Sequence, residues 1–158
     1  MAEERTGLRT RIDGFLKVPD IPGPSERDGH EEEIEVYGID FSMTAPHDPN
    51  SLSRRGRVAL SMLTLTKHYD KSSPYLKKAL QENTLMDEVV FSCRRTIDGE
   101  TSDYLVVTME EASVVTYRMG VSADETDVIE DTIGFAYKKI KFTYDDDHEV
   151  EMDVFVGK

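Results

Sequence analysis

The chain has 158 residues, a formal net charge of −13 at pH 7 and 38% hydrophobic residues, which suits one domain with a buried core. The negative charge argues against nucleic-acid binding, because that binding depends on Lys and Arg side chains that neutralise phosphates. No apolar run of about 18 residues is present, so we expect no membrane insertion. The segment MAEERTGLRTRID has no apolar stretch of the kind found in a signal peptide, so we expect no classical export signal.

The chain contains a single cysteine, Cys93, and four histidines. One cysteine excludes an internal disulfide and fits a reducing compartment. So few scattered nitrogen and sulfur ligands also predict that no structural zinc site is present.

The first third of the chain predicts two strands and two long loops. Residues 8–13 alternate apolar and charged side chains and predict a strand that ends at Gly14. Residues 34–43 predict one bent strand, because the apolar alternation changes phase across Gly38 as it does at a β-bulge. The segments 19–33 and 44–57 are rich in Pro, Gly and polar residues and predict mobile, solvated loops.

The middle of the chain predicts a deeply buried strand and a hairpin. Residues 58–69 carry apolar side chains on both faces, which is typical of a strand covered on both sides. Residues 88–111 contain two β-rich runs around Asp98-Gly99, a pair that favours the positive φ angles of a type I′ turn.

The last third predicts further strands and hence the fold class. A strand is expected at about 112–118, a loop at 119–126, and a closing hairpin from residues 133–144 and 149–156. Seven or eight strands with tight turns indicate a sandwich or a closed barrel. We favour an antiparallel β-barrel, because an open sheet would leave long exposed edges.

Residues 66–83, TKHYDKSSPYLKKALQEN, interrupt the strands with a short helix predicted at about 73–83. Ser72 or Ser73 can cap it, Pro74 suits its first turn, and Asn83 can end it in a left-handed conformation. One apolar stripe contains Tyr75, Leu76, Ala79 and Leu80. A helix this short must dock through that stripe, either as a plug over a barrel end or also as a contact with a neighbouring subunit.

No arrangement of residues predicts catalysis, a metal site or a cofactor. Cys93 alternates with bulky neighbours in a strand and is interpreted as an inert core thiol. Arg94 and Arg95 are expected to pair with acidic groups across strands. His30 is interpreted as exposed in a charged loop, and the acidic run 145–147 lacks the Gly and distal Glu of a calcium loop.

Four segments in register resemble the Hcp (haemolysin-coregulated protein) family of bacterial type VI secretion. The first is Thr66-Lys67-x-x-Asp70-Lys71-Ser72-x-Pro74-x-Leu76, at the transition from strand to helix. The others are EEIEVYGIDF at 32–41, the hairpin around Gly99-Glu100, and TIGFAYKKIKFTY at 132–144. The loop 44–57 and the acidic end of the chain depart from the family pattern.

The resemblance implies a non-enzymatic β-barrel subunit with one flanking helix, as in phage tail tubes. It implies hexameric rings that stack into a tube, expelled with a spike protein by a contractile sheath and able to carry small effector proteins in its lumen. It further implies a protein that is cytoplasmic before firing and then secreted without a cleaved signal peptide. Pro74, Tyr75, Leu76 and Leu80 are candidate subunit contacts, and Asp40 is a candidate lumen-facing residue.

Two rival functions remain open at this stage. One is the tube protein of a phage tail or of another contractile injection particle. The other, from a different class, is a small secreted enzyme or ligand-binding barrel, which would need a convergent polar pocket.

Overall fold

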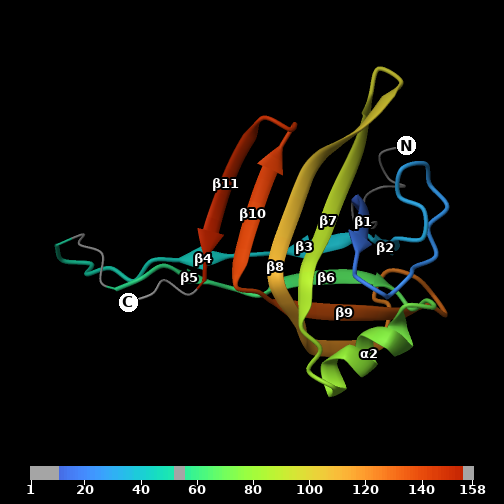
Figure 1. Cartoon of the computed structure of the whole chain (residues 1–158), viewed down its shortest axis with the longest axis horizontal. Coiled ribbons are helices and arrows are strands. Elements are labelled where there is room, and N and C mark those ends of the chain that lie inside the picture. Colours follow the sequence, from blue (N-terminus) through green and yellow to red (C-terminus); the bar gives the residue numbers. More distant parts are fainter. Residues whose placement is uncertain (1–10, 52–55, 155–158) are drawn as a thin grey trace.

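The chain folds into β-strands and one short helix (Figure 1). The computed structural model describes residues 11–51 and 56–154. The described elements, in chain order, are β1 (Asp13–Lys17), β2 (Ile34–Val36), β3 (Gly38–Asp40), β4 (Met43–Thr44), β5 (Ala59–Leu60), β6 (Leu63–His68), α2 (Ser73–Gln81), β7 (Met86–Ile97), β8 (Glu100–Val121), β9 (Ile129–Ala136), β10 (Lys139–Tyr144) and β11 (His148–Asp153). The prediction of a mainly β fold with a flanking helix is confirmed.

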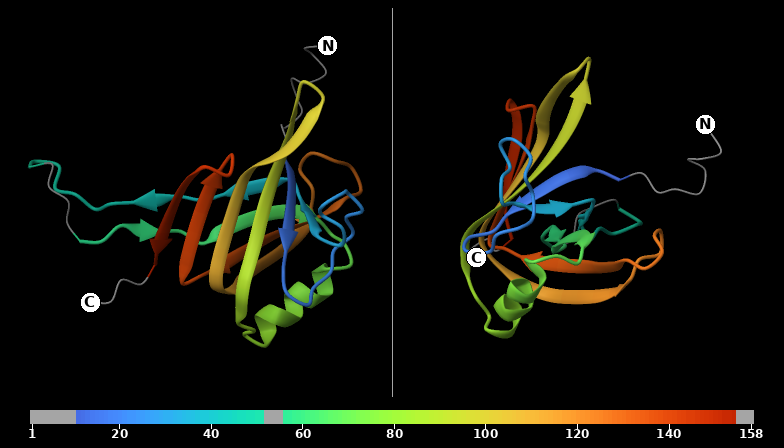
Figure 2. Two further views of the ribbon diagram at one scale, coloured as in Figure 1. Left: turned by 45° about the horizontal axis from the view of Figure 1, so that its top comes forward. Right: turned by 90° about the vertical axis from the view of Figure 1, so that its right-hand side faces the viewer.

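The strands form a curled antiparallel sheet in the order β2-β1-β7-β8-β9-β6-β3, with β10 on the first half of β8 and β11 on β10. The two ends of this order, β2 and β3, are separated in the chain only by Tyr37. The Tyr37 N–H donates to the Thr66 carbonyl at 2.9 Å, and the Tyr37 carbonyl accepts from the Ile12 N–H at 3.2 Å. The sheet therefore returns on itself at Tyr37, which gives the barrel-like shape in Figure 2.

The bent strand predicted over 34–43 is divided into β2, β3 and β4. Its bend does fall beside Gly38, but β2 pairs with β1 while β3 pairs with β6. A Cβ on Gly38 would lie 3.1 Å from the Thr66 Cβ, so the close approach of β6 favours glycine there.

The first strand lies later in the chain than predicted. Residues 8–10 lie outside the described residues, and β1 begins at Asp13 and continues through Gly14. A Cβ on Gly14 would lie 2.8 Å from both the Phe91 ring and the Val36 carbonyl. Gly14 is therefore required by tight packing in the middle of a strand, and not by a turn.

The predictions of a separate strand at 112–118 and of a loop from 119 are wrong, because β8 continues unbroken to Val121. A register shift between Val114 and Thr116 bends β8. The first half of β8 pairs with β7 and β10, and the second half pairs with β9. This bulge contains neither Gly nor Pro, so the sequence pattern does not show whether the strand bends there or ends there.

The prediction that residues 58–69 are apolar on both faces is wrong. The segment divides into β5 and β6, and the interruption around Ser61 changes the phase of the alternation. In β6, Leu63, Leu65 and Lys67 point into the protein, while Thr64 lies on the opposite face and is half-buried.

The predicted hairpin around Asp98-Gly99 is confirmed. The closing hairpin is also found, but its first arm is shorter than predicted, because residues 133–144 divide into the end of β9 and the whole of β10; residues 155 and 156 of its second arm lie outside the described residues. The β7–β8 turn has φ of 53° at Asp98 and 81° at Gly99, the positive values of a type I′ turn. The β10–β11 hairpin turns between Tyr144 and His148. The fully buried core that the strands enclose includes Leu16, Ile34, Leu65, Val89, Phe91, Val107, Met109, Ile133, Phe135 and Ile140.

The helix α2 packs against the second half of β8, below the curled sheet in Figure 1. It begins after Ser72 with Pro74 in its first turn, and Asn83 has φ of 53° just after its end, as predicted. The Ser72 hydroxyl does not cap the helix; it donates to Asp70 instead.

Candidate functional site

A cluster of charged side chains behind α2 is buried in the core. Lys67 and Asp131 have no exposed surface, and their Nζ and Oδ2 atoms lie 3.2 Å apart. The Lys67 ammonium also donates to Asp70 Oδ1 at 2.9 Å and to Ser73 Oγ at 3.0 Å. The Ser73 hydroxyl in turn donates to Asp131 Oδ2 at 2.6 Å.

This cluster explains why residues 66–76 have the sequence that they have. Lys67 comes from β6, Asp131 from β9, Asp70 from the loop before α2 and Ser73 from the first turn of α2, so the cluster fixes the helix on the sheet. Asp131 Oδ1 and the Tyr117 hydroxyl are buried without a hydrogen-bond partner among the described residues. Burial also raises the pKa of Tyr117 above its ordinary value. The cluster is thus a structural anchor, since its central pair, Lys67 and Asp131, has no surface that a substrate could reach.

A second buried cluster fixes the loop 19–33 on β8. His30 is buried, and its ring stacks on Phe15 with centroids 4.3 Å apart. Its Nδ1 lies 2.7 Å from Glu33 Oε1, and its Nε2 lies 2.9 Å from Asp103 Oδ2. The prediction of an exposed His30 is therefore wrong, because the two carboxylates and the Phe15 ring give the imidazole partners that the local sequence does not reveal.

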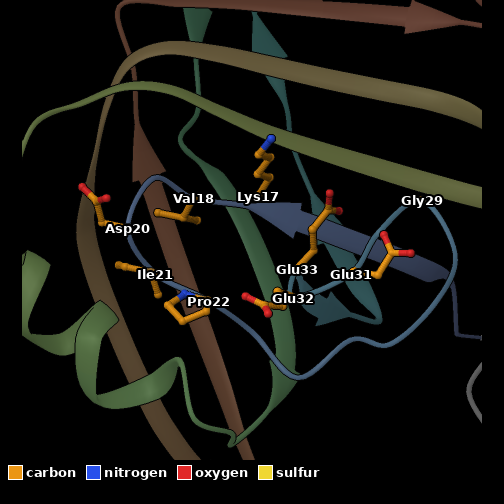
Figure 3. A pocket seen from close by; sticks show the side chains of 9 residues that line it. All are labelled: Lys17, Val18, Asp20, Ile21, Pro22, Gly29, Glu31, Glu32 and Glu33. Carbon is orange, nitrogen blue, oxygen red and sulfur yellow. The ribbon is translucent and has the colours of Figure 1, made fainter.

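A pocket lies between this loop and β1 and has a volume of about 450 Å³ (Figure 3). Its lining residues are Lys17, Val18, Asp20, Ile21, Pro22, Gly29, Glu31, Glu32 and Glu33. The pocket is open and contains no nucleophile paired with a base. Within residues 11–51 and 56–154, no group of His, Cys, Asp or Glu is arranged to hold a metal ion.

The other residues considered for chemistry have structural surroundings. Cys93 is buried beside the Tyr104 hydroxyl at 3.5 Å, which agrees with its interpretation as a core thiol. Arg94 lies 3.6 Å from Asp103 across the β7–β8 pair, and Arg95 lies 3.4 Å from Asp145. Arg94 therefore pairs across strands as expected, whereas the acidic partner of Arg95 lies in the turn between β10 and β11.

A face of small and polar residues covers the outer side of β8, β9, β6 and β3; we call it the threonine–glycine face. The strand registers align its side chains in two rows. These rows are Asp40, Thr64, Gly134 and Thr116, and Gly38, Thr66, Thr132 and Arg118. Asp40 is exposed at the edge of this face, while the opposite side of the same strands carries the apolar core.

The four residues proposed for subunit contact point in two directions. Leu76 is fully buried and Leu80 is half-buried, so both dock α2 on its own sheet. Pro74 and Tyr75 are exposed, with 53% of the Tyr75 surface accessible. The expectation that Tyr75 helps to dock the helix is wrong, because the helix turns its ring away from β8.

The exposed residues on and beside α2 form a surface that we call the helix face. It consists of Lys71, Pro74, Tyr75, Lys78 and Leu85.

A second exposed apolar surface lies on the β10–β11 hairpin; we call it the hairpin face, and it consists of Phe142, Tyr144, His148, Val150 and Met152. The registers Phe142 to Val150 and Phe142 to Val107 show that it continues the core side of the sheet. Phe142 and Met152 still pack against the core, whereas Val150 is 52% exposed and Tyr144 is 44% exposed. The ring of Phe41, near the base of the β4–β5 arm, contacts the ring of Phe142.

Together these observations define a mainly β protein in which the buried polar clusters serve the fold. The helix face and the hairpin face are two of the surfaces that expose apolar side chains, and others, among them Val115, Val121 and Ile129, lie on β8 and β9. The family described as "Type VI secretion system effector, Hcp" matches residues 15–144. The "Major exported protein" of Pseudomonas aeruginosa is 29% identical over 133 residues, covering 80% of this chain and 77% of that protein. "Protein hcp1" of the same species is 27% identical over 134 residues, covering 83% of each.

Solved structures agree with this match at the level of the fold. A doubly substituted Hcp1 protein from E. coli EAEC 042 has a TM-score of 0.80 at 24% identity, covering 93% of this chain and all of that one. Hcp1 from Salmonella typhimurium has a TM-score of 0.73 at 22% identity, covering 91% of this chain and 95% of that one.

The chain belongs to the Hcp family of type VI secretion proteins. The recognition made from the sequence is thus confirmed, and so is the prediction that the chain is not an enzyme, since Hcp proteins are structural. Within the described residues, no helix has the length and apolar character that crossing a membrane requires.

Sequence reasoning did not find the two buried polar clusters. A signal for the first was available, since Lys67 stands at a position where the alternation of β6 demands an apolar side chain. For His30 no such signal exists, because its partner Asp103 is 73 positions away.

Proposed function

We propose that this chain is the structural tube subunit of a type VI secretion system. Six copies close into a ring, rings stack into a tube, and contraction of a surrounding sheath expels the tube with its spike protein. The observation that supports this best is the presence of two exposed apolar surfaces, the helix face and the hairpin face, on a highly charged chain. Large exposed apolar patches on soluble proteins mark interaction sites.

Self-association through two different surfaces suits a ring. A contact that joins unlike surfaces repeats from copy to copy and closes if its rotation closes. The helix face and the hairpin face lie on different sides of the molecule (Figure 1), so one copy can engage two neighbours at once.

Size-exclusion chromatography with light scattering tests the proposal. We expect a species of about six times the 17.9 kDa chain mass, and annuli in negative-stain images. A stable monomer at micromolar concentration would overturn the proposal.

The threonine–glycine face is proposed as the wall of the lumen, with Asp40 available to contact small effector proteins. Thr and Gly side chains present a low, polar surface past which a cargo can move without adhering. We expect Asp40→Gln to weaken stabilisation of a co-expressed effector, whereas Glu35→Gln, at an exposed position of β2, leaves it unchanged. An effector that remains equally stable with Asp40→Gln would argue against this role.

Export follows from the same proposal. The protein would be cytoplasmic before firing and would leave the cell without cleavage of a signal peptide. Mass spectrometry of the secreted protein is expected to find peptides from the segment MAEERTGLRTRID, and loss of a segment as long as a signal peptide, about 15–30 residues, would contradict this route.

The alternative is the tube protein of a phage tail or of another contractile injection particle. The two functions share the ring and the sheath, so biophysical measurements do not separate them. Genes for a sheath and for a membrane complex beside the gene for this chain would favour type VI secretion.

A further inference from the structure

We propose that the helix face of one copy docks on the hairpin face of the next copy, so that these two surfaces are the two halves of one repeated contact. This inference rests on the proposed function, because it presupposes that the chain associates with itself. It goes further by naming which surfaces meet.

Both surfaces expose large apolar side chains that their own subunit leaves uncovered. On the helix face, Tyr75 is 53% exposed and Leu85 is 63% exposed, although the same helix buries Leu76 completely. On the hairpin face, Val150 and Tyr144 extend the apolar side of the sheet past the edge of the core. Covering each with the other removes both from water.

The charges around the two surfaces have opposite signs. Lys71 and Lys78 are exposed on the helix face, with Lys77 half-buried beside them. One exposed carboxylate, Glu82, follows Lys78 by one turn on the same side of the helix, so lysines outnumber carboxylates there. The turn of the hairpin carries three exposed acidic residues, Asp145, Asp146 and Asp147, at the tip of the hairpin face. Glu149, Glu151 and Asp153 are also exposed, but they alternate with Val150 and Met152 and so lie on the opposite side of β11. The lysines of the hairpin do not balance these carboxylates, and Lys139 is already within 3.6 Å of Glu151.

This difference in charge indicates which surface of another copy can dock on the hairpin face. In a chain with a net charge of −13, two hairpin faces would repel each other, and so would two helix faces. Only the pairing of a helix face with a hairpin face brings lysines to carboxylates. A second copy of this chain, approached by its opposite surface, therefore fits both the apolar and the charged part of the hairpin.

Two surface variants make the inference testable. The helix variant combines Tyr75→Asp with Lys78→Glu, and the hairpin variant carries Val150→Lys. All three side chains are exposed, so both variants are expected to keep a cooperative thermal unfolding and to become monomeric. The control Glu35→Lys changes an exposed charge on β2, away from both surfaces, and is expected to assemble as the unaltered chain does.

The decisive measurement is a mixture of the two monomeric variants. The helix variant retains an intact hairpin face, and the hairpin variant retains an intact helix face. An equimolar mixture is therefore expected to form heterodimers of twice the 17.9 kDa chain mass and nothing larger, as measured by light scattering.

Other results would overturn the inference. A mixture that stays monomeric would mean that the two faces do not meet, and a variant that still forms complete rings would mean that its face is not in the contact. In both cases the proposed function would stand, because the unaltered chain would still assemble; a monomeric unaltered chain would refute both. If Val150→Lys loses its cooperative unfolding, Tyr144→Lys on the same face replaces it.

Discussion

At the scale of single residues, the most informative side chain is Lys67. A lysine without exposed surface is costly unless its charge is paired and its protons are bonded. Asp131, Asp70 and Ser73 meet both needs, and three of these four residues lie within seven positions of each other. The local sequence thus builds most of its own anchor, and only Asp131 arrives from a distant strand.

We expect Lys67→Met to destabilise the fold by about 3–5 kcal/mol, because it leaves the buried Asp131 carboxylate without its cation. Chemical unfolding monitored by circular dichroism measures this change. Lys71→Met is the matched control, since Lys71 is exposed and its loss is expected to change the stability by no more than about 0.5 kcal/mol. Equal effects of the two substitutions would contradict the anchor.

Tyr137 provides a second test at this scale. Its hydroxyl donates to the Ser61 carbonyl at 2.5 Å, and burial raises the pKa of Tyr137 from 10.0 to about 12. Because the folded-state pKa lies above that of the unfolded chain, this contribution to stability is complete below pH 10 and is lost as the pH rises to about 12.

We therefore expect the free energy of unfolding to fall between pH 10 and about pH 12, and Tyr137→Phe to reduce that slope by at most about 1.4 kcal/mol per pH unit. Urea unfolding at several alkaline pH values measures the slope. The Phe variant is expected to retain part of it, because burial also raises the pKa of Tyr37 and Tyr117. An unchanged slope would show that Tyr137 does not titrate in this window.

At the scale of elements, α2 is a helix of nine residues that would be marginal alone. It is held by the Lys67 cluster at its first turn and by Leu76 and Ala79 against the sheet. Its neighbour Tyr75 faces solvent. Of two adjacent helix residues, Leu76 therefore stabilises the fold, while Tyr75 is available for contact with another molecule.

We expect Leu76→Asp to cost at least about 3 kcal/mol of stability, because it removes a buried leucine and places a carboxylate in the core. Tyr75→Asp is expected to leave the melting temperature nearly unchanged while it impairs assembly. Thermal unfolding and light scattering on both variants separate the two effects. Normal stability of Leu76→Asp would refute the docking of α2 through this residue.

At the scale of the whole molecule, charge opposes the association that the apolar surfaces favour. The net charge of −13 makes copies repel one another over roughly a Debye length, which is about 30 Å at 0.01 M salt and 8 Å at 0.15 M. Assembly therefore depends on ionic strength.

We expect the mass average from light scattering to rise when salt increases from about 0.01 M to 0.15 M, because screening shortens the repulsion. Sedimentation velocity at fixed protein concentration checks the same change. Assembly that weakens with added salt would show that ion pairs across the contact outweigh the overall repulsion.

The sequence by itself determined the fold class, the family, the two hairpins and the position of the helix. These features depend on alternation, turn residues and capping residues that are neighbours in the chain, so local patterns reveal them. Asp98-Gly99 and the segment 66–76 are the clearest cases.

Only the tertiary structure decided the rest. The continuous β8, the change of partner at Tyr37 and the burial of His30 depend on contacts between residues far apart in the chain. The direction of Tyr75 was decided in the same way. The apolar stripe of the helix includes Tyr75 and Leu76, but the sheet covers only part of that stripe, so Leu76 is buried and Tyr75 is exposed. The buried pair of Lys67 and Asp131 shows the reason: a charge is tolerated in the core only when folding brings its partner to it.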